Sequence, residues 1–171
     1  MHPQRTPQYT IRTARPQDLV AVCELIRRRR VWLSERGIDQ WKDYEDFFPT
    51  SYFSQRIADG ELLVACNDSQ EICAAVTQRK HDPYWTGREP AKALYLHNLV
   101  SAPQACGAGA VLLDSCEKNA RTQGYDRLRL DCQADNAPLN AYYAARGFSS
   151  VGECLEGTYR GVLREKNLCE K

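Results

Sequence analysis

A turn with two glycines, Gln104–Gly109, joins an apolar, strand-like run, Leu94–Val100, to a helix-like run, Ala108–Gln123. The first N–H groups of a helix have no partner inside the helix, and the helix dipole favours negative charge near them. Gly107 and Gly109 allow the backbone to approach a phosphate without a Cβ in the way. The order strand, glycine turn, helix therefore predicts a site for an anion such as a phosphate.

Two familiar nucleotide motifs do not fit this turn. The G-x-G-x-x-G fingerprint of dinucleotide-binding folds has Leu112 where its third glycine would stand, and no Gly-Lys-Ser/Thr follows as in a P-loop. A second motif lies further along, in which Asn136 is followed after six residues by Tyr143 and then, after three more, by a Gly-Phe pair. Asn136 is a good helix cap, and Pro138 is tolerated in the first turn, so this motif predicts a helix that carries Tyr143.

In this order the two motifs resemble the coenzyme A diphosphate loop and the tyrosine helix of the GCN5-related N-acetyltransferase (GNAT) family. The resemblance covers nearly the whole chain, about residues 9–168, and includes the opening Ile11–Asp18 and the ending Gly161–Lys166. It implies an enzyme that moves the acetyl group of acetyl-CoA, its co-substrate, to a primary amine by direct attack in a ternary complex. It also implies a single domain that spans residues 1–171.

Composition agrees with one ordinary globular domain and excludes several partners. The chain has 171 residues, 43% of them hydrophobic and 26% charged, and a formal net charge of +1. No bulk charge draws it to nucleic acid, no apolar run approaches the ~20 residues that span a bilayer, and the N-terminus lacks the apolar core of a signal peptide. We therefore expect a cytoplasmic protein that binds neither nucleic acid nor membrane.

Two unusual groups of residues have ordinary explanations. Four consecutive arginines, Arg27–Arg30, point in different directions on a helix and are expected to form a solvated face. None of the eight cysteines forms a CxxC pair and only three histidines are present, so no metal site is expected, and the thiols should stay reduced in a cytosol. Cys106 lies in the glycine turn, where the helix N-terminus could activate its thiol, but a small residue tolerated in a tight turn is the favoured interpretation.

Hydrophobic periodicity predicts an α/β protein in which strands and helices alternate. The expected strands are Tyr9–Arg12, Glu61–Cys66, Glu71–Arg79, Ala93–Val100, Asp126–Cys132, Phe148–Gly152 and Tyr159–Asn167. The expected helices run from Asp18 to a break at Gly37, over Ser51–Ala58, over Ala108–Gln123, and after Asn136. This order resembles the layered GNAT fold, with a central mixed, mostly antiparallel sheet of about seven strands flanked by helices. In that fold the fourth and fifth strands splay, and the pantetheine arm of the coenzyme lies in the gap.

On the coenzyme side, the resemblance assigns the diphosphate to the backbone N–H groups from Cys106 to Ala110, with Gln104 at the position where the family has Gln or Arg. The loop residues Ala105, Cys106, Gly107, Ala108 and Gly109 supply no arginine. Coenzyme affinity is therefore expected to depend on backbone amides.

Other coenzyme contacts also follow from the resemblance. It assigns polarisation of the thioester carbonyl to the N–H of Leu99 or Val100, a donor commonly worth ~3–4 kcal/mol. It also brings Asn136 and Asn140 to the coenzyme, although Asn136 is a helix cap as well and Asn140 could equally lie on a solvated face.

The leaving thiolate needs a proton, and Tyr143 stands where the family places its general acid. A phenol with a pKa near ~10 stays protonated at neutral pH and can donate. The alternative is a core aromatic residue, because Tyr143 shares a helical face with Leu139 and Arg146. Tyr142 is its neighbour and could be mistaken for it.

The acceptor ammonium must lose a proton, and His97 is the best candidate base. It alternates with Tyr95 on the predicted strand, and serotonin-type acetyltransferases of the family carry catalytic histidines on the matching strand. A histidine that only hydrogen-bonds inside the sheet is an equal alternative. Asp131 is a second candidate, which could instead be a structural carboxylate, and His81 is a weaker third.

The acceptor pocket is the least determined part of the sequence. The connection Glu35–Asp46 holds five acids and two bases together with Trp41 and Tyr44, and a later loop holds Trp85. With Asp131, these aromatic residues are candidates for binding a small cationic or aromatic amine through carboxylates and cation–π contacts. An acidic surface loop with core aromatics is an equal alternative.

Two other functions stay open. One is acetylation of a protein or peptide, at an N-terminus or a lysine; the other is a non-catalytic, CoA-binding regulatory module. Because many GNAT proteins are dimers, a homodimer is also compatible with the resemblance.

Overall fold

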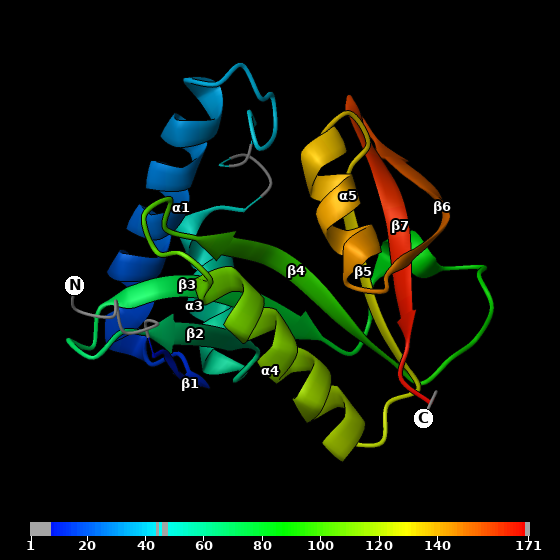
Figure 1. The fold of residues 1–171 in the computed structure, drawn as a ribbon, viewed down its shortest axis with the longest axis horizontal. Helices are drawn as coiled ribbons and strands as arrows, with labels where there is room; N and C mark the ends of the chain where they lie inside the picture. Colours follow the sequence, from blue (N-terminus) through cyan, green and yellow to red (C-terminus); the bar gives the residue numbers. More distant parts are fainter. Residues whose placement is uncertain (1–7, 44, 46–47, 170–171) are drawn as a thin grey trace, which may run out of the picture. The chain divides into compact units, whose positions relative to one another are not determined.

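The computed structural model describes residues 8–43, 45 and 48–169, and Tyr44, one of the predicted substrate-binding residues, lies outside them. The strands are β1 (Thr10–Thr13), β2 (Leu62–Cys66), β3 (Ile72–Arg79), β4 (Ala93–Ser101), β5 (Arg127–Gln133), β6 (Ser149–Glu156) and β7 (Tyr159–Asn167) (Figure 1). The α-helices are α1 (Leu19–Ser34), α3 (Thr50–Ala58), α4 (Ala108–Thr122) and α5 (Ala137–Ala145), and two short 3₁₀ helices are η1 (Pro16–Asp18) and η2 (Pro83–Trp85).

The fold class predicted from the sequence is confirmed. Hydrogen-bonded neighbours give the order β1-β2-β3-β4-β5-β7-β6 in one seven-stranded sheet. β4 and β5 are parallel, whereas β1–β2, β2–β3, β5–β7 and β6–β7 are antiparallel. The register of the parallel pair runs from Ala93↔Arg127 to Leu96↔Leu130.

The chain divides into two compact units. The first comprises the described residues up to Thr77 together with Asn98–Ser115, and the second comprises Gln78–His97 together with the described residues from Cys116 onward. The single domain expected from the sequence stays a prediction.

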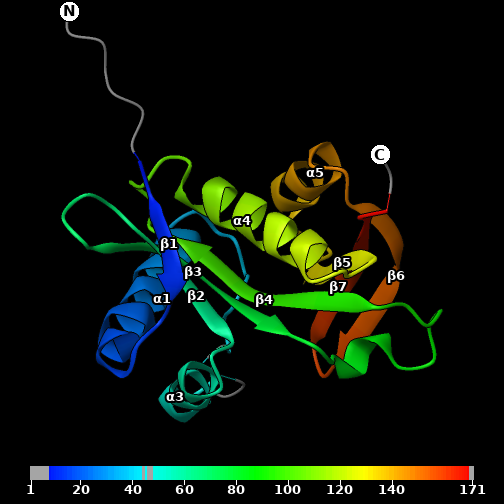
Figure 2. The same ribbon diagram turned by 90° about the horizontal axis from the view of Figure 1, so that it is seen from below.

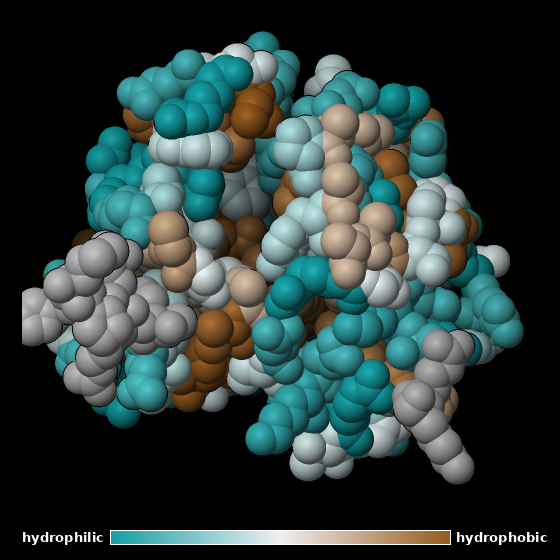
Figure 3. All heavy atoms as spheres, viewed as in Figure 1, coloured by the Kyte–Doolittle hydropathy of each residue, from teal (hydrophilic) through white to brown (hydrophobic). Residues whose placement is uncertain are grey.

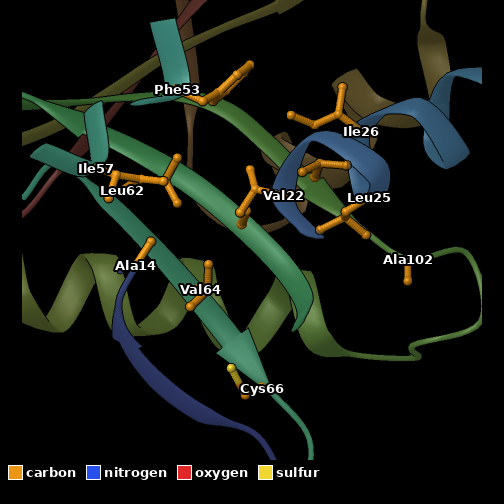
Figure 4. Close-up of a cluster of buried hydrophobic side chains, with 12 residues drawn as sticks. Ala14, Val22, Leu25, Ile26, Phe53, Ile57, Leu62, Val64, Cys66 and Ala102 are labelled. Atoms are coloured by element: carbon orange, nitrogen blue, oxygen red, sulfur yellow. The ribbon is translucent and has the colours of Figure 1, made fainter. Parts of the chain in front are cut away.

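A hydrophobic core holds the first unit together. Val22, Leu25 and Ile26 of α1 belong to one buried cluster with Leu62 and Val64 of β2, and Val22 lies between the helix and the strands (Figure 4). Their spacing of three and four residues places them on one face of the helix. α1 and α3 lie on one face of strands β1 to β3 and the beginning of α4 lies on the other (Figure 2). Burial of each such aliphatic side chain stabilises the unit by roughly 1.5–3 kcal/mol.

The arginine run differs from the expectation. Arg27 pairs with Glu24 at 2.7 Å and is exposed, as a solvated face requires. Arg29 instead donates from Nε to the backbone oxygen of Ser101 at 2.8 Å and from Nη2 to its Oγ at 3.0 Å. Arg30 donates to the backbone oxygen of Trp41 at 3.0 Å. Two of the four arginines therefore hold chain segments in place, because the tertiary fold brings carbonyl groups to their side of α1.

One face of α4 is apolar and buried. Leu112, Leu113, Cys116 and Ala120 are buried. The outer face of the C-terminal part of α4 carries hydrophilic side chains (Figure 3). Burial raises the pKa of the Cys116 thiol to about 12, so this cysteine acts as a small hydrophobic residue. None of the eight cysteines is in a disulfide.

The second unit is built on β5, β7 and β6. α5 covers one face of these strands (Figures 1 and 2). A cluster of Trp85, Ala93, Tyr95, Cys154 and Leu163 forms a further part of its core. The β6 strand runs to Glu156, four residues beyond the predicted end at Gly152, because its antiparallel pairing with β7 continues to Glu156↔Tyr159. No helix among the described residues is both long and apolar enough to cross a membrane.

Candidate active site

The predicted phosphate loop has the local geometry of a helix entrance. Gly107 has φ +81°, a left-handed conformation that favours glycine. The N–H of Ala108 donates to the backbone oxygen of Ala105 at 3.2 Å, and the N–H of Val111 donates to that of Gly107 at 3.0 Å. The side chains of Gln104 and Cys106 are exposed, whereas Ala108 is fully buried. The loop therefore presents the first turn of α4, where helical N–H groups lack intrahelical partners.

Two side chains of the first unit brace this loop. The Tyr9 hydroxyl donates to the backbone oxygen of Cys106 at 3.0 Å, and Arg29 holds Ser101 as described above. A Cβ placed on Gly109 would meet the Cβ and Oγ of Ser101 at 3.5 Å, which is ordinary van der Waals contact. Arg29 and Ser101 thus bear directly on the first turn of α4, although Arg29 was expected on a solvated face and Ser101 was not singled out from the sequence.

The candidate oxyanion donors, Leu99 and Val100, follow a residue with unusual backbone geometry. Asn98 has φ +56° inside β4, and a left-handed residue within a strand is the local geometry of a β-bulge. Its side-chain oxygen accepts a hydrogen bond from the Tyr52 hydroxyl at 3.3 Å. Asparagine adopts this conformation more readily than most residues, which is the signal that the sequence carried. A bulge redirects the N–H groups that follow it.

Tyr143 lies in the core of the second unit. Its side chain is 6% exposed, and its ring makes edge contacts with Phe148 at 5.7 Å and Tyr142 at 5.4 Å between centroids. Burial, with smaller contributions from Cys132 and Tyr142, raises the pKa of Tyr143 above that of an ordinary phenol. The hydroxyl therefore stays protonated across the physiological range, as a proton donor must. Tyr142 is 36% exposed.

The two asparagines assigned to the coenzyme have internal partners. The Asn136 side chain caps α5, because its oxygen accepts from the N–H of Leu139 at 3.1 Å. The Asn140 amide donates to the backbone oxygens of Gln133 and Asn136, each at 2.9 Å, and accepts from Arg164. The Asn136 cap agrees with the sequence analysis. The partners of Asn140 favour a structural role over the solvated face.

A cluster of ionisable groups gathers around His97 in the second unit. His97 Nε2 lies 3.4 Å from Oδ2 of Asp82, and one ligand atom each from Asp82, His97 and Asp131 lie within 4.8 Å of one another. Asp82 is 3% exposed, and its Oδ1 accepts a hydrogen bond from the N–H of Tyr84 at 2.9 Å, which caps η2. His97 and Asp131 were candidates from the sequence, whereas Asp82 was not, although an Asp-Pro pair is a typical helix start.

Tyrosine residues complete this cluster. The Tyr159 hydroxyl donates to Oδ2 of Asp131, and the Tyr84 hydroxyl donates to Glu156. Burial raises the pKa of Asp131, while the Tyr159 hydrogen bond and the charge of His97 act in the opposite direction. Tyr159 reaches Asp131 across β7 and β5, where Gly161 leaves room for its ring. Sequence spacing carried no signal for this pair, because their strands are paired only in the fold.

The predicted acceptor-binding aromatics lie in hydrophobic surroundings. Trp85 is 5% exposed, and the Arg129 guanidinium lies 4.5 Å from its ring centroid. Trp41 packs against the core of the first unit. His81, the third candidate base, is exposed. The described aromatic candidates thus agree with the core-aromatic alternative, while Asp131 is part of the His97 cluster.

The sequence and the fold both match those of known acetyltransferases. A family model described as the acetyltransferase (GNAT) family matches residues 21–148. Over 150 residues, 82% of each chain, the sequence is 27% identical to an uncharacterized N-acetyltransferase, YesJ, of Bacillus subtilis (strain 168). An acetyltransferase structure of the GNAT family from Listeria monocytogenes matches with a TM-score of 0.77 and 26% identity, covering 93% of this chain and 94% of that one.

A structure with bound coenzyme also has this fold. It is the PaiA N-acetyltransferase from Thermoplasma acidophilum in complex with coenzyme A, with a TM-score of 0.71 and 18% identity. The match covers 94% of this chain and 99% of that one. At this identity the likeness concerns the fold alone.

Proposed function

The chain belongs to the acetyltransferase (GNAT) family and is an acetyl-CoA-dependent N-acetyltransferase, and from this premise we propose that its acceptor is a small cationic or aromatic primary amine. The observation that carries the proposal is the group of carboxylates around His97. Asp82 is buried there, and Asp131 is half-buried. Buried carboxylates are costly unless a cation or hydrogen bonds compensate them, and an ammonium group is such a cation.

Tyr143 is proposed as the general acid. The amine nitrogen attacks the thioester carbonyl carbon, the carbon–sulfur bond breaks, and the departing thiolate takes the phenolic proton. The buried environment that keeps this phenol protonated supports the role. Proton transfer by a positioned side chain typically contributes 10²–10⁴-fold to a rate.

His97 is proposed as the base that takes the proton of the acceptor ammonium, so that a neutral amine attacks. A second proton leaves the nitrogen as the amide forms and restores the Tyr143 phenol, while the proton on His97 passes to solvent between turnovers. Asp131 is proposed to attract the ammonium group. Its raised pKa makes its charge sensitive to pH, so attraction should increase as the carboxyl ionises.

Coenzyme binding is proposed to rest on the loop from Gln104 to Ala110. Backbone N–H groups at the start of α4 would bind the diphosphate, and the N–H of Leu99 or Val100 would polarise the thioester carbonyl. The loop holds no arginine of its own.

A kinetic panel of acceptors tests the proposal. Release of free thiol from acetyl-CoA is measured with a diamine, an arylalkylamine, an aminoglycoside, and two peptides with a free N-terminus or a free lysine. We expect kcat/KM at least about tenfold higher for the small cationic amines, and a KM for them that rises with salt concentration. Activity confined to the peptides would overturn the small-amine proposal in favour of protein acetylation. Coenzyme binding without turnover of any amine would favour the regulatory module.

A further inference from the structure

One carboxylate oxygen of Asp82 is buried without a hydrogen-bond partner. Its Oδ1 caps η2, whereas Oδ2 is buried and accepts no hydrogen bond. A carboxylate oxygen in this state is costly, and buried polar atoms in proteins nearly always have a partner. The group that Oδ2 faces is the His97 ring, with 3.4 Å between Oδ2 and Nε2.

Asp82 and His97 differ in how much of each side chain is exposed to solvent. The Asp82 side chain is 2% exposed, while the His97 side chain is 14% exposed. The histidine is therefore the more accessible of the two side chains. A distance of 3.4 Å is longer than an ordinary N–H···O hydrogen bond, and such contacts in enzymes commonly tighten once substrate binds.

We propose that Asp82 is a positioning residue for acetyl transfer: its carboxylate faces Nε2 of His97 and orients the imidazole that takes the acceptor's proton. This inference rests on the proposed role of His97 as the base. The Asp82 carboxylate also stabilises the imidazolium that forms when His97 accepts the proton.

Other groups face this pair and set its charge balance. Asp131 on β5 supplies a second carboxylate, but its Oδ2 already accepts the Tyr159 hydroxyl from β7. Tyr84 on η2 and Cys154 on β6 are also close enough to interact with Asp131. Burial keeps both of these groups protonated at neutral pH, because it raises the pKa of Tyr84 and raises that of Cys154 to about 12. Neither group therefore adds a charge beside His97 at neutral pH.

Asp82→Asn is the discriminating variant. The asparagine oxygen can still cap η2, so the fold of the loop is retained. The NH₂ group that replaces Oδ2 cannot accept a hydrogen bond from Nε2 of His97. We expect kcat to fall about 10- to 100-fold with KM for acetyl-CoA within about twofold of the parent value. Because a negative charge beside the imidazole is lost, the acid limb of the kcat/KM profile should move to lower pH.

Three further variants distinguish a loss of positioning by Asp82 from a folding defect and from a failure of His97 as the base. Asp68→Asn removes an exposed carboxylate in the β2–β3 turn and should leave activity unchanged. Asp82→Ser, which also keeps a cap, should reproduce the kinetic defect if Asp82→Asn fails to fold. His97→Gln should lose at least as much activity as Asp82→Asn, and little further loss is expected when the two are combined.

Three results would overturn the proposal. Full activity of Asp82→Asn with an unchanged pH profile, together with an inactive His97→Gln, would remove Asp82 alone from the mechanism. Full activity of His97→Gln would remove the proposed base itself. Activity that is lost with EDTA and restored by Zn²⁺ or Mn²⁺ would make Asp82, His97 and Asp131 ligands of a metal ion rather than a proton-transfer pair.

Discussion

Arg164 donates two hydrogen bonds to the side-chain oxygen of Asn140, from Nε at 3.2 Å and from Nη2 at 2.9 Å. Arg164 is buried, and its Nη1 donates to the backbone oxygen of Phe148 at 3.1 Å. The Asn140 amide also ties the start of α5 to the end of β5 through Gln133. Asn140 therefore joins a helix to two strands of the second unit, so its main expected contribution is to stability.

Replacement of Asn140 by alanine should destabilise the protein without weakening coenzyme binding. It leaves a buried guanidinium short of an acceptor and removes two bonds to backbone oxygens, a loss of about 2–3 kcal/mol. The melting temperature should fall by about 4–12 °C. Calorimetry and KM for acetyl-CoA check this, with the exposed Gln123→Ala as control. An unchanged melting temperature with a raised KM would mean that Asn140 contacts the coenzyme instead.

Tyr143→Phe should reduce kcat about 10²-fold while binding of acetyl-CoA, measured by calorimetric titration, is retained. Because burial raises the pKa of Tyr143, kcat of the parent enzyme should show no decline from ionisation of this group below about pH 10. Tyr142→Phe is the matched control on the neighbouring, partly exposed ring. Equal activity of the two variants would assign Tyr143 to the core alone.

Asp131→Asn should stabilise the protein at neutral pH. Since burial raises the pKa of Asp131, the folded state holds its proton more tightly than the unfolded state does. Its contribution to stability is therefore present below the unfolded pKa, near ~3.9, and is lost as pH rises through the folded value. The free energy of unfolding, measured in urea, should exceed that of the parent at pH 7–8 and approach it near pH 3–4, while KM for cationic amines rises. Asp135→Asn, an exposed carboxylate, is the control. Lower stability at neutral pH would show that Asp131 is a favourable charge in the fold.

The two loop glycines should respond differently to alanine. Gly109 has room for a methyl group, so Gly109→Ala should keep its melting temperature and raise KM for acetyl-CoA about tenfold or more, because the Cβ blocks the diphosphate. Gly107 has φ +81°, so Gly107→Ala should also lose about 1–2 kcal/mol of stability. Unchanged KM in Gly109→Ala would place the diphosphate elsewhere.

Local patterns predicted the elements that carry the chemistry, and tertiary contacts decided what surrounds them. The Asn136 cap and the buried stripe of α4 could be predicted because both depend on neighbours within a few residues. The partnership of Asp131 with Tyr159 could not, because it depends on strand pairing between distant segments. The sequence left Trp85 equally open to substrate binding and to the core, and only the fold shows that Arg129 lies over its ring.

The most direct test of this account is the melting temperature of the protein with acetyl-CoA, CoA and NADH. A ligand at ~100 times its dissociation constant adds about 2.7 kcal/mol to the free energy of unfolding. For a chain of this size that is a rise of about 5–10 °C. We predict this rise with acetyl-CoA and CoA and none with NADH. The absence of a shift with either coenzyme A species would contradict the account, since a loop without arginine would then fail to hold the diphosphate.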